Sequence, residues 1–188
     1  MVSFVGSGER DSFSTLAQLV NNGQVWSAGE AVGVAAVIAP PTLLSQLSLY
    51  NNEDNGGLSY RPLRVFAIVT STPAGLSQFQ LVHCVHRAQP TPIPPANIPI
   101  TSITNHKANF GAYAGRARIA LALTVVDDLW KPLGYSILNA VTGVGWGLDV
   151  WLDDLVIIPP GGLYSIGVVA STTTVLTRAG VSWAEEQV

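Results

Sequence analysis

The fold of this chain is constrained most by a succession of short apolar runs that alternate between two faces and are separated by turn residues. Residues 163–170 are one such run, in which Tyr164, Ile166 and Val168 share a face. This two-residue period is that of a β-strand. About nine or ten runs of this kind follow one another, and no long helical pattern interrupts them. We therefore predict an all-β protein, a jelly-roll-like antiparallel β-sandwich of about eight main strands in two sheets.

The expected strands cover most of the chain after residue 24. Their ranges are 25–39, 43–50, 63–72, 79–87, 108–117, 118–126, 134–141, 148–158, 163–171 and 175–183. The run 63–72 is apolar on both faces, which predicts a central strand that is covered on both sides. Pro159-Pro-Gly-Gly162 should reverse the chain, because proline lacks a donor and glycine accepts a positive φ. We expect this turn to form a terminal hairpin that closes one edge of the jelly roll.

Two segments depart from the strand pattern. Residues 88–99 contain five prolines, and each removes a hydrogen-bond donor, so this segment should cross the surface in an extended form. Residues 1–24 contain Leu16, Leu19 and Val20 at helical spacing, and Asn22-Gly23 should end that helix. We expect residues 1–24 to be an N-terminal arm docked on the body or on a neighbour, and residues 25–188 to be a single β-sandwich domain.

The chain is poor in charge. Charged residues make up 11% of its 188 residues, against about 25% in an average soluble domain. Charge normally keeps a free surface soluble and the edge of a sheet unpaired. We therefore expect much of the surface to be buried against other subunits in a homo-oligomer. A neutral surface rich in Ser, Thr, Asn and Gln is the alternative.

The same composition argues against several partners. The formal net charge is −3 and no run is basic, which is unlike a nucleic-acid-binding surface. No apolar run reaches the ~20 residues of a membrane-spanning helix, and the N-terminus lacks the pattern of a secretion signal. Cys84 is the single cysteine, so an intrachain disulfide is excluded, which fits folding in the cytosol. We expect neither nucleic acid nor membrane as a partner.

The most tempting metal ligands lie in His83-Cys-Val-His86. In a strand, His83 and His86 point to opposite faces, so only Cys84 and His86 share a face. A structural zinc site needs four ligands, and nothing in the sequence places His106 beside this pair. We expect ordinary strand residues here, with a metal site as the alternative, and we predict no metal and no cofactor.

Catalytic and sugar-binding groups are also candidates. A glycosidase needs two carboxylates roughly 5–9 Å apart, and adjacent residues on a strand diverge, so we predict no catalytic residue. The acidic pairs are Asp127-Asp128, Asp153-Asp154 and Glu185-Glu186.

Aromatic rings that could stack on sugars are more often core or interface residues. The rings in question are those of Trp130, Trp146, Trp151 and Tyr113.

Three features carry a family resemblance. They are Leu47-Ser-Leu-Tyr-Asn-Asn52 followed by Leu63-Arg-Val-Phe-Ala-Ile-Val69, the turn Pro159-Pro-Gly-Gly162, and the closing Ala179-Gly-Val-Ser-Trp-Ala-Glu-Glu186. Together they resemble small virion proteins of tailed bacteriophages that decorate or cement heads or sit on tails and baseplates. The resemblance covers residues 43–188. It implies a jelly roll, a trimeric or otherwise symmetric assembly bound to a capsid, and no catalytic residue.

These observations lead to one hypothesis and three alternatives. The chain is expected to be a non-enzymatic phage virion protein, a capsid decoration or cement protein that forms a homotrimer on the major capsid protein or other virion proteins. It would be made in the host cytoplasm and located in the virion. Its expected interface residues are Phe4, Phe13, Leu16, Leu19 and Trp183. The alternatives are a carbohydrate- or receptor-binding module of a tail or baseplate, a shell-forming jelly-roll capsid protein and, last, an enzyme.

Overall fold

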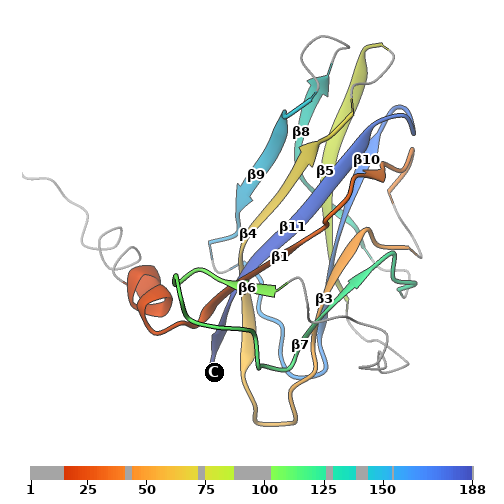
Figure 1. The fold of residues 1–188 in the computed structure, drawn as a ribbon. Coiled ribbons are helices and arrows are strands. Elements are labelled where there is room, and N and C mark those ends of the chain that lie inside the picture. Colours follow the sequence, from red (N-terminus) through yellow and green to blue (C-terminus); the bar gives the residue numbers. More distant parts are fainter. Residues whose placement is uncertain are drawn as a thin grey trace, which may run out of the picture.

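The strands of the protein form two antiparallel sheets that pack as a sandwich (Figure 1). The computed structural model describes residues 15–40, 44–71, 75–86, 103–125, 129–138, 144–153 and 155–187. The strands in these residues are β1 (Val25–Gly29), β2 (Val34–Ala35), β3 (Leu47–Asn51), β4 (Ser59–Val69), β5 (Ser77–His86), β6 (Ile103–Asn105), β7 (Ala117–Leu121), β8 (Lys131–Leu138), β9 (Gly147–Trp151), β10 (Leu163–Ala170) and β11 (Leu176–Glu186). Sheet A has the order β6-β1-β11-β4-β9, with β2 also paired to β11, and sheet B has the order β7-β3-β10-β5-β8. The predicted all-β sandwich is confirmed.

The strand pairing is nested. Going inward from the two ends of the sandwich domain, β1 pairs with β11, β3 with β10, β4 with β9, and β5 with β8, all antiparallel. This is the pattern of one long hairpin rolled into two sheets, which is the jelly roll. Strands β6 and β7 come between β5 and β8 in the chain and extend the sheets beyond β1 and β3. Strands β8 and β9 are therefore the sheet edges on the other side of the sandwich.

The turn at Pro159–Gly162 forms as predicted, but it does not join a hairpin. The amide of Gly162 donates to the carbonyl of Pro159 at 2.8 Å, and Gly161 has a φ of +78°, as a type II turn with Pro160 before it requires. However, β9 and β10 on either side of it belong to different sheets, as do β10 and β11. The predicted terminal hairpin at a closing edge is therefore wrong. Both β10 and β11 are interior strands whose partners come from distant parts of the chain.

Strand β4 begins earlier than predicted and is less covered. It starts at Ser59 and passes through Pro62 at a bulge, where its pairing with β11 shifts. A bulge accommodates a residue that lacks a backbone donor. On the outer face of β4, Phe66 is half-buried and Ile68 is exposed. The prediction of a strand covered on both faces is therefore wrong for this part of β4.

The core lies between the two sheets. Its largest fully buried side chains are Trp183, Tyr60, Tyr164, Phe79, Leu47, Leu49, Leu81, Ile119, Ile158, Leu163 and Ile166. At the end near β6, the ring of Tyr113 meets Trp26 edge-on at a centroid distance of 4.7 Å and Trp183 at 6.4 Å. Trp183 has 0% exposure, so it fills the core of its own subunit. The prediction of Trp183 as an interface residue is wrong.

A short helix, residues 15–21, packs on the outer face of sheet A. It ends where the sequence predicted, because Gly23 adopts a φ of +74°. The amides of Gly23 and Gln24 then donate to the carbonyls of Val20 and Leu19 at 3.0 and 2.9 Å, which is the Schellman motif. The buried face of the helix joins a small cluster with sheet A that contains Leu16, Leu19, Val20, Val25, Leu63 and Ala184.

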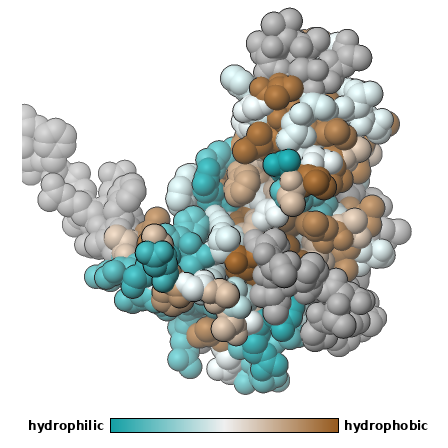
Figure 2. All heavy atoms as spheres, viewed as in Figure 1, coloured by the Kyte–Doolittle hydropathy of each residue, from teal (hydrophilic) through white to brown (hydrophobic). Residues whose placement is uncertain are grey.

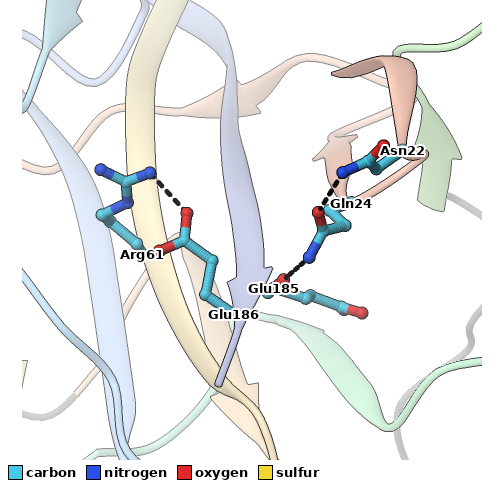
Figure 3. A network of polar contacts seen from close by, with 5 residues as sticks. All are labelled: Asn22, Gln24, Arg61, Glu185 and Glu186. Atoms are coloured by element: carbon cyan, nitrogen blue, oxygen red, sulfur yellow. Dashed lines mark hydrogen bonds and ion pairs between the residues drawn. The ribbon is translucent and has the colours of Figure 1, made fainter. Parts of the chain in front are cut away.

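Polar contacts hold the residues after this helix to the end of β11 (Figure 3). Gln24 Nε2 donates to the carbonyl of Glu185 at 3.1 Å, and Asn22 Nδ2 donates to Gln24 Oε1 at 3.3 Å. Beside them, Arg61 of β4 pairs with Glu186 at 2.5 Å.

The predicted interface residues of the arm fall into two groups. Leu16 and Leu19 pack against the body of their own subunit. Leu19 is buried there, whereas Leu16 is half-buried, and their contact with a neighbour stays a prediction. Their burial follows from the docking of the helix on sheet A. Phe4 and Phe13 lie outside the residues that the structure describes.

Candidate assembly surface

Charged residues are unevenly distributed along the chain. The stretches 31–52, 65–86, 88–106, 132–148 and 155–177 contain no Lys, Arg, Asp or Glu. These stretches supply nearly all of β3, β5, β8 and β10, the inner strands and one edge of sheet B. Figure 2 shows hydrophilic residues gathered mainly at the lower end, around the helix, and hydrophobic residues over much of the upper body. Sheet B is therefore poor in charge, whereas sheet A carries exposed charged side chains such as Arg178 and Asp149.

Large apolar side chains are exposed at this upper end, where β4 leads to β5 and β8 leads to β9. Leu76, Tyr135 and Ile137 are 79%, 70% and 64% exposed. We call the exposed set the apolar end; its members are Ile68, Leu76, Tyr135, Ile137, Val144 and Trp146. Ile68 faces outward from sheet A, and Tyr135 and Ile137 face outward from sheet B, so the set lies around this end of the sandwich. Exposed apolar groups that gather at one end of a domain mark interaction surfaces.

Backbone and side-chain hydrogen bonds hold the apolar end in place. The amide of Val69 donates to the carbonyl of Trp146 at 2.7 Å, and the amide of Gly145 donates to the carbonyl of Val69 at 2.9 Å. The indole of Trp146 donates to Ser136 Oγ of β8 at 2.9 Å. The start of β9, including the exposed ring of Trp146, is thereby fixed against both β4 and β8.

The same region contains two sheet edges, and one of them is unprotected over half its length. Strand β8 is an edge of sheet B and β9 is an edge of sheet A. Natural edges are blunted by charge, proline or a bulge. Strand β8 has Lys131, Pro132 and a register shift at its beginning, but none of these devices from Gly134 onward. The second half of β8 is thus open to pairing and lies beside the apolar end.

The predicted metal ligands do not converge. Cys84 and His86 share a face as expected, with Cys84 Sγ 3.8 Å from His86 Nδ1, and His83 lies on the inner side against the hydroxyl of Tyr164 at 3.2 Å. His106 directly follows β6 of sheet A, and its Nε2 is 2.9 Å from Ser27 Oγ of β1. Within the described ranges, no three His, Cys, Asp or Glu side chains lie close enough to hold a metal ion.

A buried hydrogen-bond chain extends from His86 instead. His86 Nε2 is 2.9 Å from Ser165 Oγ, which is 2.7 Å from Ser48 Oγ, which is 2.6 Å from Ser45 Oγ. All four residues are buried. The chain links β5, β10 and the residues around the start of β3 on the outer side of sheet B. Buried polar groups that satisfy one another in this way rigidify a sheet, and sequence analysis missed Ser45, Ser48 and Ser165 because lone serines on strands give no signal.

The acidic residues are dispersed as well. Asp127, Asp128 and Asp154 lie outside the described residues, and Asp153 is exposed with a φ of +39°. Glu185 is buried and Glu186 pairs with Arg61, so these neighbours diverge as adjacent strand residues should.

Glu185 is held in an aromatic environment. Its Oε1 accepts hydrogen bonds from the hydroxyl of Tyr113 at 2.6 Å and from the indole of Trp183 at 3.2 Å. Burial raises the pKa of Glu185 above its ordinary value, and these two hydrogen bonds offset part of that rise. The carboxyl is therefore a structural acceptor at the end of the core.

We expect the Glu185→Gln variant to be less dependent on pH in its stability than the wild type. A carboxyl whose pKa is raised by folding contributes stability that is complete below its unfolded value near 4.5, and that contribution is lost as the pH rises through the raised folded pKa. Glutamine keeps the acceptor oxygen and does not ionise. Urea unfolding of both proteins between about pH 4 and 7 should show the wild type losing stability relative to the variant, and a pH-independent difference would contradict this account.

The tryptophans do not assemble a sugar-binding platform. Trp26 and Trp183 are buried, Tyr113 is buried too, and Trp130 is half-buried with its ring 6.1 Å from that of His86. Trp146 and Trp151 are exposed but lie at opposite ends of β9. Trp146 bonds to β8, whereas Trp151 is opposite Arg64 of β4.

Comparison with known proteins adds a distant structural likeness. No family model matches the chain, and no curated protein sequence matches it. Among solved structures, it is similar to a chain in the structure of deformed wing virus carrying the GFP gene, with 12% identity and a TM-score of 0.24, over 98% of this chain and 85% of that chain. At this identity and TM-score the likeness does not transfer a function, so we base the proposal below on the surfaces described above.

No helix in the part of the chain that the structure describes has the length and hydropathy needed to cross a bilayer.

Proposed function

We propose that this chain is a non-enzymatic structural protein of a virus particle, which assembles through the apolar end and the adjacent edge of β8. The observation that carries the proposal is the set of exposed apolar side chains beside the open second half of edge strand β8 on a jelly roll. Jelly rolls are a recurrent fold of viral capsid proteins. In a closed ring of copies, the patch of each copy meets a different surface of the next copy, so ring closure would cover both features in every copy.

Within this class, the proposed role is that of a decoration or cement protein. In this role the chain forms a homotrimer, binds the major capsid protein of a tailed bacteriophage and is located in the virion. The support is its small size, its low content of charged residues and the resemblance carried by its turns and closing strand. A protein that cements a shell works by fit and needs no reactive group.

Replacing Ile137 with lysine should weaken assembly at least tenfold and leave folding intact. Ile137 is 64% exposed in the subunit, so the substitution costs the isolated subunit little. In a closed interface the ammonium would be buried without a partner, which costs several kcal/mol. The measurement is the concentration dependence of the mass by light scattering, with far-UV circular dichroism as a check on folding.

The matched control is Ile157→Lys, which makes the same change at a 49% exposed isoleucine outside the apolar end. Only the Ile137 variant should dissociate. If both variants assemble like the wild type, or both fail equally, the apolar end is not the interface. Closed particles formed by the wild type alone would favour the shell-forming alternative over decoration, because a decoration protein needs a separate shell.

A further inference from the structure

A small apolar cavity lies on the side of the sandwich that is opposite β8 and β9. It lies between β2 of sheet A and the end of β7 of sheet B, and its volume is about 100 Å³. Strands β3, β10 and β5 separate β7 from β8 in sheet B, and Figure 1 shows β8 and β9 on one flank of the domain and β7 on the other. The cavity and the open edge of β8 therefore belong to different flanks of one subunit.

The cavity opens to the surface through an apolar rim. Val34, Leu44 and Leu121 line it and are 37%, 49% and 52% exposed. These residues come from the stretches 31–52 and 119–126, which contain no Lys, Arg, Asp or Glu. An uncharged rim around an apolar hollow is the kind of surface that an apolar group of a partner can cover without burying an unpaired charge.

Backbone hydrogen bonds fix the walls of the cavity. The amide of Val37 donates to the carbonyl of Val168 at 3.0 Å, which ties the segment after β2 to β10. The amide of Ala122 donates to the carbonyl of Gln46 at 3.1 Å, which ties the end of β7 to the residue before β3. The backbone around the cavity is therefore set within the isolated subunit.

The polar side chains of the lining have partners within the subunit. Glu30 is buried, and its Oε2 accepts hydrogen bonds from the amide of Ala179 and from Gln46 Nε2, both at 2.7 Å. Ser45 Oγ lies 2.6 Å from Ser48 Oγ. An apolar occupant can therefore enter the cavity without breaking these hydrogen bonds.

The size of the cavity restricts its occupant. An apolar cavity of ~150 Å³ accommodates benzene, so one of this volume has room for about four carbon atoms, which is the size of an isoleucine or leucine side chain. Ile137 meets this condition, is 64% exposed and lies on the open second half of edge strand β8. Tyr135, which faces the same way on β8, is too large for the cavity.

In a ring of copies, the apolar end of one copy needs an acceptor on a different surface of the next copy. We propose that the cavity between β2 and β7 is this acceptor and receives the side chain of Ile137 from a second copy, which rests on the proposed assembly of the chain through its apolar end. The contact removes apolar surface from water on both copies, and this removal favours association. It places the flank that carries β8 in one copy against the flank that carries β7 in the next.

Disulfide trapping in equal mixtures of two single-residue variants tests this contact on the full chain. Ile137→Cys and Leu121→Cys place one thiol on the inserted position and one on the rim of the cavity. The natural Cys84 is the single cysteine of the chain and is buried, so it should not interfere. After mild oxidation, covalent dimer should form at least tenfold faster in the mixture than with either variant alone. The matched control replaces Leu121→Cys with Leu155→Cys, at a leucine that is 72% exposed and belongs to neither surface, and its mixture should show no such gain.

A second pair of variants tests the contact without a cross-link. Leu121→Trp should fill the mouth of the cavity and weaken assembly at least tenfold by light scattering, whereas Leu155→Trp should leave assembly unchanged. If Leu121→Trp assembles like the wild type, the cavity is not the acceptor.

The cross-linking pattern separates failure of the cavity from failure of the assembly surface. Covalent dimer from Ile137→Cys alone, with no gain in the mixture, would overturn the cavity as acceptor and keep the apolar end as the interface, because the same residue of two copies would then meet. No dimer in any sample, together with an Ile137→Lys variant that assembles like the wild type, would overturn both.

Discussion

Replacing Trp183 with alanine should lower the free energy of unfolding by about 3–5 kcal/mol, the usual loss for a large aromatic residue removed from a core. The indole is fully buried in β11, packs edge-on against Tyr113, and donates to Glu185 at 3.2 Å. Alanine would leave a cavity between the sheets and remove one donor from a buried carboxyl. Denaturant unfolding monitored by circular dichroism measures the change.

The matched control is Trp151→Ala, because Trp151 is 55% exposed on the edge strand β9. That substitution should alter the free energy of unfolding by less than about 0.5 kcal/mol. If Trp183→Ala fails to fold, Trp183→Phe should show the same direction with a smaller loss. A Trp183 variant that is fully stable but no longer assembles would restore the interface role that the structure rejects.

The second large effect is expected at Asn51, at the end of β3. This residue is 0% exposed, and its Nδ2 donates to the carbonyls of Leu58 and Ile158 at 2.8 and 2.9 Å. Its Oδ1 accepts from the amide of Glu53 at 3.0 Å. One side chain thus joins the turn after β3 to the residues before the turn at Pro159–Gly162. Asn51→Ala should lower the free energy of unfolding by about 2–4 kcal/mol, because these two carbonyls and this amide lose their hydrogen-bond partner.

Two further variants separate hydrogen bonding from packing. Asn51→Asp keeps the shape but removes both donors and places a carboxylate against two carbonyls, so it should destabilise at least as much as alanine. Asn52→Ala, at the neighbouring and less buried position, should change the free energy of unfolding by less than about 0.5 kcal/mol. An Asn51→Asp variant as stable as the wild type would show that these hydrogen bonds contribute nothing.

Local patterns in the sequence predicted the strands better than they predicted the pairing. The alternation of Tyr164, Ile166 and Val168 identified β10, and all three side chains are buried. The partners of β10 are β3 and β5, far away in the chain, and no local signal specifies them. The turn at Pro159–Gly162 has the backbone of a tight turn, yet it connects two sheets. The turn residues determine that the chain reverses, whereas the overall topology determines which sheet the next strand joins.

Irregular backbone accounts for other differences. The predicted strand 108–117 is largely a loop, in which Asn109 and Gly111 adopt positive φ values of 61° and 102°. The predicted strand 63–72 begins after Pro62, but a bulge at Pro62 lets β4 start earlier, at Ser59. In both places tertiary packing outweighs the local strand pattern. The loop brings Tyr113 into the core, and Leu63, next to the bulge, packs with the helix.

The candidate sites were predicted in part. Low charge and few lysines pointed to a surface that needs a partner, and the structure locates exposed apolar groups beside an open edge. Alternation alone could not show that the face of Trp183 is the inner one. The sequence did not reveal Glu30 as a buried acceptor, because its donors, the amide of Ala179 and Gln46 Nε2, lie far from it in the chain.

The central claim is that this jelly roll functions by assembling with other copies or with a shell. The most direct measurement is the mass of the purified wild-type chain by light scattering coupled to size-exclusion chromatography, over a range of micromolar concentrations. We expect a species whose mass is a whole multiple of the 19.8 kDa chain, three times that mass for the proposed trimer. A single species of 19.8 kDa at every concentration would contradict self-assembly through the apolar end.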